Sequence, residues 1–300
     1  MEPIRIAVVG LGKIARDQHL PSIGASRDFS LAATVSPHDP GTPGIPHRPS
    51  LEALLDEGPA CDAVALCIPP QVRHDLAALA LQRGIHVLLE KPPGATLAEV
   101  AALEATADKV GATLFAAWHS RFAAGVAPAK AWLSERRIER VAITWREDVR
   151  VWQPGGLGVF DPGINALSIA THILPRPFFL DPARLGFPLN RAAPIGASLQ
   201  FRDTGGAAIG MDLDWRQTGP QSWDILVETD AGVLKLSNGG AVLSLPAGTT
   251  HAEDFEYPGL YARFATLIRT GLSDVDVSPL RLVADAFLRG ERVLTEAFHD

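Results

Sequence analysis

The sequence lacks the features that mark secreted, membrane-bound or metal-dependent proteins. Its only cysteines, Cys61 and Cys67, have a spacing that fits no zinc or redox motif, and its nine histidines form no ligand-spaced cluster. No apolar stretch reaches the roughly 20 residues that a membrane-spanning helix needs. The first apolar strand begins at Ile4, which leaves no room for a signal peptide. We therefore predict a cytoplasmic protein that binds neither membrane nor metal.

Positive charge is also scarce. The net charge of -7 argues against a nucleic-acid partner. What is present is ordinary globular material, with 47% hydrophobic and 20% charged residues, so the chain can bury a substantial core. At about 150 residues per domain, a chain of 300 residues is expected to form two domains.

The first 120 residues alternate short apolar runs with amphipathic segments, which is typical of a parallel sheet with crossover helices. We predict strands at 4–9, 29–35, 63–68, 86–89 and 113–117, and helices at 51–57, 72–83 and 97–110. This pattern predicts an α/β fold for residues 1–120, a doubly wound Rossmann domain that binds a dinucleotide.

Residues 121–300 follow a different pattern, which indicates an α+β domain with a mainly antiparallel sheet. We expect this domain to serve substrate binding and oligomerisation, a role that the family resemblance described below implies. We predict a helix at 127–135, an apolar helix at 166–174 and a closing helix from 279 to about 298. The predicted strands are 141–145, 198–201, 207–215, 223–229, 233–236 and 242–245. The run Ser237-Asn238-Gly239-Gly240 is the clearest hairpin signal.

A glycine turn follows the first predicted strand and opens a helix. In Gly10-Leu11-Gly12-Lys13-Ile14-Ala15, Gly10 permits a tight turn, Gly12 lets backbone N–H groups approach a pyrophosphate, and Ala15 permits close helix packing. A glycine-rich turn without a ligand is the alternative. Because of its place in the chain, we predict that this stretch, including Lys13 and Ile14, binds a dinucleotide.

The end of the second strand should determine the choice of cofactor, because an acid there holds the ribose hydroxyls of NAD. The chain has Ser36, Pro37 and His38 at this point, with neither an acid to repel a 2'-phosphate nor an arginine to bind it. We therefore expect use of both NAD and NADP, with Ser36 and His38 as hydrogen-bond donors. Pro69 and Pro70 end the next strand at the same edge, where they either terminate it or contact the cofactor.

Lys91 stands in Glu90-Lys91-Pro92, at the carboxyl end of a buried strand. A surface lysine at the start of a helix is the alternative. Because the carboxyl ends of parallel strands border the cofactor crevice, we predict that Glu90 and Lys91 face this crevice and that Lys91 is catalytic.

Asp161 and Asn165 lie four residues apart in a glycine-rich stretch that leads into an apolar helix. On a helix they would share one face. Asp161 before Pro162 also has the pattern of an N-cap followed by proline at the first helical position. A capping carboxylate would be a poor base, so capping and catalysis remain open alternatives for Asp161.

These motifs, in this order, resemble the glucose-fructose oxidoreductase and inositol dehydrogenase family. The resemblance is closest to the bacterial dehydrogenases that oxidise L-arabinose and D-galactose at C1. It extends over nearly the whole chain, in the stretches 12–19, 89–93, 118–120, 147–150, 155–165 and 273–276.

The resemblance implies oxidation of an aldose to its lactone with transfer of a hydride to NAD or NADP. Asp161 would accept the proton of the C1 hydroxyl, and Lys91 would orient that oxygen. His119, Glu147 and Asn165 would bind other hydroxyls, while Trp152 and Trp223 would offer ring faces to the sugar. A backbone-satisfied His119, a surface Glu147 and core tryptophans are the alternatives. A homodimer is expected by family analogy.

The sequence departs from these relatives in three places. Many members of the broader family have a histidine where this chain has Asn165, and some relatives have an arginine where it has Pro37. Between Arg150 and Gly155 only four residues stand where a longer loop is expected. Two alternatives stay open. One is another family oxidoreductase that acts on a cyclic polyol or diol. The other, because the loop before Gly155 is short, is a catalytically weak NAD(P)-binding sensor.

Overall fold

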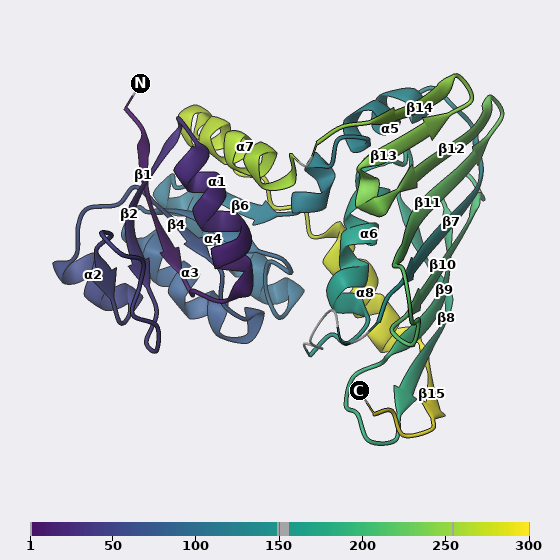
Figure 1. Ribbon diagram of the computed structural model, residues 1–300, viewed down its shortest axis with the longest axis horizontal. Helices are drawn as coiled ribbons and strands as arrows, with labels where there is room; N and C mark the ends of the chain where they lie inside the picture. The colour runs from purple at the N-terminus through teal and green to yellow at the C-terminus, as the bar shows by residue number, and fades with distance from the viewer. Residues whose placement is uncertain (1, 149, 151–155, 254, 300) are drawn as a thin grey trace. The chain divides into compact units, whose positions relative to one another are not determined.

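The computed structural model describes residues 2–148, 150, 156–253 and 255–299, and the chain divides into two compact units (Figure 1). The first unit comprises Met1–His119 and Tyr257–Val277. The second comprises Ser120–Glu256 and Ser278–Asp300. We predicted one boundary after residue 120 and did not foresee that a later segment returns to the first unit.

The first unit is built on a six-stranded sheet in the order β3-β2-β1-β4-β5-β6, and every neighbouring pair in it is parallel. The strands are β1 (Ile4–Val9), β2 (Phe29–Val35), β3 (His47–Arg48), β4 (Ala63–Leu66), β5 (His86–Glu90) and β6 (Leu114–Ala117). This order is that of a Rossmann fold, so the predicted fold class is confirmed. Only β3, an edge strand of two residues, was not predicted.

Helices connect the strands of this sheet and pack against it. They are the π-helical turn η1 (Ala15–His19), α1 (Leu20–Ala25), α2 (Leu51–Glu57), α3 (Arg73–Gln82) and α4 (Leu97–Val110). The ends of α4 follow from its sequence. Thr96 and Glu99 form a capping box at its start, and Gly111 ends it in the left-handed conformation.

Helix α7 (Glu256–Thr270) brings the chain back to the first unit. Its Phe264 is fully buried and stacks on Phe29 of β2 and Phe115 of β6, with ring centroids 5.8 Å apart in both pairs. Asp274, farther along the returning segment, forms a parallel bridge with Phe115. This packing explains why the segment belongs to the first unit.

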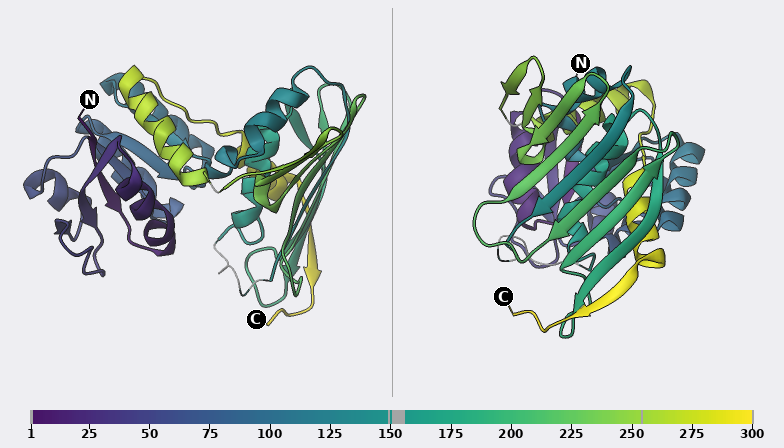
Figure 2. Two further views of the ribbon diagram at one scale, coloured as in Figure 1. Left: turned by 45° about the horizontal axis from the view of Figure 1, so that its top comes forward. Right: turned by 90° about the vertical axis from the view of Figure 1, so that its right-hand side faces the viewer.

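The second unit is a nine-stranded mixed sheet in the order β14-β13-β12-β11-β7-β10-β9-β8-β15 (Figure 2). The strands are β7 (Ile138–Arg146), β8 (Phe178–Pro188), β9 (Gly196–Asp203), β10 (Ala208–Asp214), β11 (Ser222–Thr229), β12 (Gly232–Ser237), β13 (Val242–Leu245), β14 (Gly248–His251) and β15 (Glu291–Thr295). The pairs β7–β10 and β8–β15 are parallel and the others antiparallel, as expected for a mainly antiparallel sheet. The predicted hairpin between β12 and β13 is confirmed.

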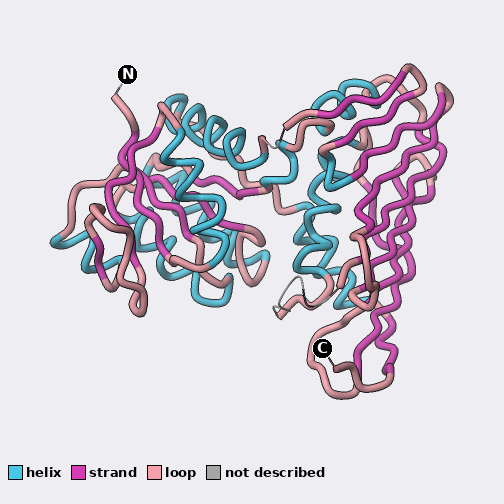
Figure 3. Tube along the Cα trace, viewed as in Figure 1, coloured by secondary structure: helices cyan, strands magenta, loops and turns pink. Residues whose placement is uncertain are grey.

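The helices α5 (Val126–Leu133), α6 (Phe160–Ile173) and α8 (Ser278–Arg289) lie along one face of this sheet, as the trace in Figure 3 shows. Strand residues alternate accordingly. In β10, Ile209, Met211 and Leu213 are buried, whereas their neighbours in the strand are partly or fully exposed. No helix in the described part of the chain is long and apolar enough to span a membrane.

The predicted closing helix is wrong in its second half. Helix α8 ends at Arg289, and β15 then pairs with β8 in parallel. Gly290 weakens the helix at this point. Pairing of β15 with the edge of β8 gives the backbone groups of both segments their hydrogen-bond partners. The helical periodicity of 279–289 concealed this change of structure.

Candidate active site

The residues predicted to contact the cofactor lie at the carboxyl ends of strands in the parallel sheet. The glycine turn follows β1, Ser36 follows β2, Pro69 follows β4, and Glu90 ends β5 just before Lys91. His119, which was predicted to bind the sugar, follows β6. Because these strands are parallel, their carboxyl ends lie along one edge of the sheet, where α/β proteins bind their ligands. The first unit therefore brings this predicted set to a single edge.

The glycine turn is tied to the neighbouring strand. Gly10 has a φ of +89°, and its N–H donates to the carbonyl oxygen of Val35 at 2.8 Å. A Cβ on Gly10 would lie 2.8 Å from the carbonyl oxygen of Cys67, so only glycine fits. Apart from Gly12 itself and the adjoining chain, no heavy atom of the described residues lies within 4 Å of the place where a Cβ on Gly12 would stand, which leaves space for a phosphate group.

The residues that follow Gly12 differ in how they are exposed. Ala15 is buried and Ile14 half-buried, whereas Lys13 is exposed and pairs with Asp17 one helical turn later. The turn therefore fits the dinucleotide for which its sequence is typical, through its backbone rather than through Lys13.

At the end of β2 the chain forms a loop that returns as β3. Ser36 is half-buried and its carbonyl oxygen accepts from His47 Nε2 at 3.1 Å, while His38 is exposed. Asp39, one residue beyond the stretch considered in the sequence, pairs with Arg16 of η1, with 2.5 Å between Arg16 Nη2 and Asp39 Oδ2. The hydrogen bond from Arg16 lowers the pKa of Asp39. Sequence reasoning missed both residues because it looked for charges only within three residues of the strand.

The end of β4 is shaped by a buried arginine that was also missed. Pro69 is exposed and Pro70 half-buried at the start of a short helical turn, Pro70–Val72. Arg73, 2% exposed, donates to the carbonyl oxygens of Ile68, Glu90 and Pro92. Burial lowers the pKa of Arg73 to about 10, so the side chain stays charged at neutral pH. Arg73 thereby joins the ends of β4 and β5.

Glu90 points into the protein. It is 3% exposed, and its carboxylate accepts hydrogen bonds from the backbone N–H of Lys91 at 2.6 Å and from Tyr257 Oη at 2.8 Å. His19 Nε2 lies 3.2 Å away. Burial alone would raise the pKa of Glu90, but the hydrogen bond from His19 and the charges of His19, His119 and Lys91 lower it to about 2. The Glu90 side chain, predicted to contact cofactor, is instead committed to these internal partners.

His19 is the partner of the Glu90 carboxylate. Its Nδ1 lies 2.7 Å from Tyr261 Oη, and its ring is fully buried. Burial works against the charged imidazolium, yet the surrounding groups, Cys67, Tyr261 and Glu90, raise the pKa of His19 well above its usual value. The raised pKa favours the protonated form of His19 beside the Glu90 carboxylate. The π-helical geometry of η1, a form common at functional sites, carries this residue.

Lys91 and His119 lie at the ends of neighbouring strands. Lys91 is half-buried, follows β5 directly and precedes a cis proline. The ring of His119 stacks on Tyr257, with centroids 5.0 Å apart. Tyr257 therefore touches both His119 and Glu90, so α7 supports the strand ends that carry the predicted catalytic lysine.

In the second unit, Asp161 lies inside the first turn of α6. The helix begins at Phe160 and its N-cap is Val159, so the capping alternative for Asp161 is wrong. The helix starts earlier than expected because Gly158, with a φ of +56°, turns the chain into it. Asp161 and Asn165 are both half-buried and share a helix face, as expected from their spacing.

Glu147 follows β7 and is 9% exposed, so the surface-charge alternative does not hold. Its N–H donates to the carbonyl oxygen of Asp214 at the end of β10. Burial and the charge of Asp148 raise the pKa of Glu147. Helix α6 packs closely on the same strand, since a Cβ on Gly163 would lie 2.7 Å from Leu213 Cδ1. Glu147 and the start of α6 therefore adjoin one end of β10.

Trp223 of β11 pairs in register with Trp145 of β7 and is half-buried, so it is not enclosed in the core as Trp145 is. Trp152 and the shortened stretch 151–154 lie outside the described residues. The described residues contain no group of three histidine, cysteine, aspartate or glutamate side chains that could hold a metal ion.

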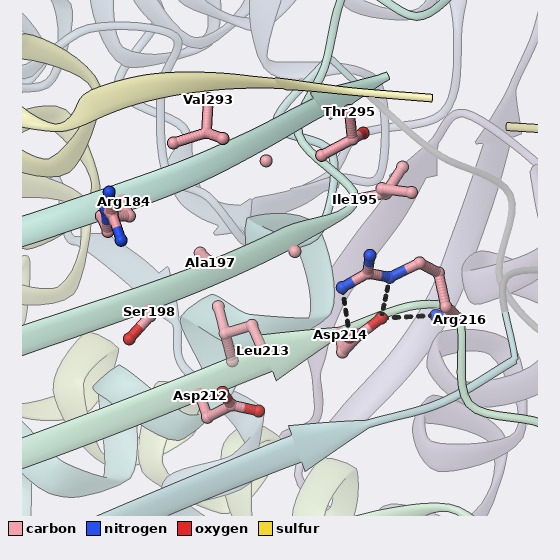
Figure 4. A pocket seen from close by; sticks show the side chains of 12 residues that line it. Arg184, Ile195, Ala197, Ser198, Asp212, Leu213, Asp214, Arg216, Val293 and Thr295 are labelled. Atoms are coloured by element: carbon pink, nitrogen blue, oxygen red, sulfur yellow. Dashed lines mark hydrogen bonds and ion pairs between the residues drawn. The ribbon is translucent and has the colours of Figure 1, made fainter. Parts of the chain in front are cut away.

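A hollow of about 280 Å³ lies on the sheet of the second unit (Figure 4). It forms where Gly186 of β8 faces Gly196 of β9, and Asp212, Asp214 and Arg216 line its other side. Among the described residues, none of those predicted for the site lines this hollow. Figure 4 shows Arg216 turned toward Asp214, with which it forms an ion pair of 2.7 Å.

The parallel sheet and its glycine turn define a dinucleotide-binding protein. Residues 4–117 match the family described as an oxidoreductase family with an NAD-binding Rossmann fold. The chain is 45% identical to galactose 1-dehydrogenase from Pseudomonas fluorescens, over 100% of both proteins. The chain therefore belongs to this family of NAD-binding oxidoreductases, and the resemblance predicted from its motifs is confirmed.

Solved structures agree with this assignment. A D-galactose-1-dehydrogenase protein from Rhizobium etli is 57% identical, with a TM-score of 0.95 over 100% of this chain and 99% of that one. The 3-ketoreductase KijD10 from Actinomadura kijaniata, solved with NADP and TDP-benzene, is 18% identical and shares the fold, with a TM-score of 0.84 over 98% of this chain and 99% of that one.

Proposed function

We propose that this protein oxidises an aldose at C1 to the lactone, with D-galactose as the first candidate and L-arabinose, which shares its hydroxyl pattern, as the second. The observation that carries the proposal is similarity over the whole chain to two galactose 1-dehydrogenases, at 45% and 57% identity. Similarity confined to the first unit would support cofactor binding alone.

The reaction removes a proton from the C1 hydroxyl and a hydride from C1, so that the C1–O1 bond becomes a carbonyl. When bound, the nicotinamide accepts the hydride. In our proposal Asp161 accepts the proton, and its place inside the first turn of α6 rather than at the N-cap supports this assignment. Lys91 orients O1 by its charge. The base and the cation would act as a coupled pair.

The other predicted residues would hold the sugar. Glu147 is buried with a raised pKa, as expected for a carboxylate enclosed with few charged partners, and it would accept from sugar hydroxyls. Asn165 and His119 would contribute further hydrogen bonds. The half-buried ring of Trp223 would pack against the sugar's C–H groups.

For the cofactor we propose use of both NAD and NADP. The backbone of the Gly10–Ala15 turn would hold the pyrophosphate, and Ser36 and His38 would face the adenosine ribose. Neither Ser36 nor His38 carries a negative charge at neutral pH that would repel a 2'-phosphate.

The test is the initial rate of nicotinamide reduction with D-galactose, L-arabinose, D-glucose and myo-inositol, using NAD and NADP separately. Turnover of D-galactose or L-arabinose should fall by about 100- to 10,000-fold in Asp161→Asn and Lys91→Ala, the usual range for loss of acid–base groups. Asp108→Asn and Lys109→Ala, on the exposed end of α4, are the matched controls and should keep full activity.

Turnover of myo-inositol but of no aldose would assign a cyclic polyol as substrate. Cofactor binding without turnover of any compound would favour the sensor alternative.

A homodimer is our proposal for the assembly, because no helix of the second unit's described residues covers the outer face of its sheet. Light scattering should give twice the chain mass of 32.0 kDa.

A further inference from the structure

Two charged side chains meet where the adenosine end of a dinucleotide would lie. Arg16 belongs to η1, directly after the glycine turn, and Asp39 belongs to the loop after β2. The hydrogen bond from Gly10 to Val35 holds the glycine turn against the end of β2. The Arg16–Asp39 ion pair, at 2.5 Å, therefore spans the gap between the two segments that flank the adenosine ribose in a Rossmann fold.

We propose that Arg16 and Asp39 together set the choice between NAD and NADP. Asp39 accepts from the ribose 2'-hydroxyl of NAD, and Arg16 binds the 2'-phosphate of NADP. The inference rests on the proposed use of both cofactors and deepens it. Sequence reasoning found neither an acid nor an arginine near Ser36, and the structure places one of each there.

The pair is built so that it can exchange partners. The side chains of Arg16 and Asp39 are 44% and 23% exposed, and solvent-exposed ion pairs stabilise proteins only weakly. A phosphate offers Arg16 two oxygens for charge-assisted hydrogen bonds, which are stronger than neutral ones. Arg16 can therefore leave Asp39 for a phosphate at small cost.

Asp39 is held more firmly than its partner. Its Oδ1 accepts from the N–H of Gly41 at 2.9 Å, and its loop returns to the sheet where His47 bonds to Thr34 Oγ1 and to the carbonyl oxygen of Ser36. The carboxylate thus stays in place when NADP binds. It then repels the phosphate, which opposes the attraction by Arg16.

Neighbouring cations are directed elsewhere. Lys13 pairs with Asp17, and Arg48 donates to the carbonyl oxygens of His47 and Glu57. Arg48 also lies at the end of β2, in register with Val35, but its guanidinium is bonded to these carbonyl oxygens. Arg16 is the cation that pairs with Asp39 there.

The test measures dissociation constants of NADH and NADPH by nicotinamide fluorescence, which needs no sugar. Asp39→Asn should tighten NADPH by about tenfold, because it removes a like charge beside the phosphate, and it should weaken NADH several-fold. Arg16→Gln should weaken NADPH by about 10- to 100-fold, as expected for a lost charge-assisted bond, with NADH within about twofold.

The double variant tests whether the two residues act as a unit. The gain in NADPH binding from Asp39→Asn should be smaller when Arg16 is already glutamine, because the freed guanidinium is then absent. Asp62→Asn is the matched control. Its partner Arg5 is the second residue of β1 and lies near the amino-terminal ends of the strands, and their exposed pair is 2.6 Å long. This variant should leave the ratio of the two dissociation constants unchanged.

The proposal would be overturned if the ratio of the NADH and NADPH dissociation constants in Asp39→Asn stayed within twofold of the wild-type ratio. An Arg16→Gln variant that weakens NADH and NADPH equally would also overturn it, since Arg16 would then act on the shared pyrophosphate. These outcomes are distinct from failure of the proposed sugar oxidation, which would leave both cofactor constants measurable.

Discussion

Two ion pairs that begin on the same π-helical turn have opposite characters. His19 and Glu90 are at most 3% exposed, and two tyrosines and a backbone N–H complete their hydrogen bonds. Arg16 and Asp39, the latter beyond the end of β2, form a pair that is open to solvent. The same helical turn thus carries His19, whose pair with Glu90 is buried, and Arg16, whose pair with Asp39 is exposed and can exchange partners.

The difference follows from the cost of moving a charge. A charge buried without its partner is strongly unfavourable, so the His19–Glu90 pair cannot open while the protein stays folded. An exposed charge is solvated by water when its partner leaves. The buried pair is suited to hold the backbone of Lys91 in place, and the exposed pair to respond to a ligand.

Replacing Glu90 should have the largest effect. Glu90→Gln keeps the shape of the side chain but leaves His19 without its carboxylate. We expect a loss of about 3–5 kcal/mol in the free energy of unfolding, the usual cost of breaking a buried pair. Turnover should also fall, because the N–H of Lys91 loses a charged acceptor at 2.6 Å. Urea unfolding and the steady-state turnover rate measure the two effects.

Asp39→Asn is the control within the comparison. It should change the free energy of unfolding by at most about 1 kcal/mol, the limit for an exposed pair. If both variants lose the same stability, burial does not separate the two pairs. A Glu90→Gln protein as stable as the wild type would show that the network is not needed for folding.

Sequence patterns predicted the first sheet almost completely, because parallel strands that are buried on both faces appear in the sequence as short apolar runs. In the second unit the patterns missed β8, β14 and β15. Strand β8 contains Pro182 and Pro188, and proline is unusual inside strands. Strand β15 forms by pairing with the edge of β8. Such pairing depends on tertiary structure, which local periodicity does not encode.

For the candidate site, sequence position correctly placed the predicted cofactor residues at strand ends. It could not show which way a side chain points. Glu90 turns inward because His19, Tyr257 and Tyr261 come from segments up to 171 residues away. Arg73 was missed for the same reason, since its partners are backbone carbonyls that meet only in the folded chain.

The buried pair also makes a prediction about pH. The pKa of Glu90 is lowered from 4.5 to about 2, so its contribution to stability is complete above pH 4.5 and is lost as the pH falls through this range. The pKa of His19 is raised above 6.5, so its contribution is complete below pH 6.5 and is lost as the pH rises through the raised value. The pair should therefore stabilise the protein most between these limits.

The measurement is the difference in free energy of unfolding between the wild type and Glu90→Gln at a series of pH values. Subtracting the variant removes the titration of groups that both proteins share. The difference should be greatest from pH 4.5 to 6.5 and should fall on the acid side by roughly 3 kcal/mol, the equivalent of the lowered pKa of Glu90. The same subtraction with Asp39→Asn should give a nearly flat alkaline side, because His19 keeps its Glu90 partner in both proteins. A flat difference for Glu90→Gln would mean that His19 and Glu90 are not held as an ion pair.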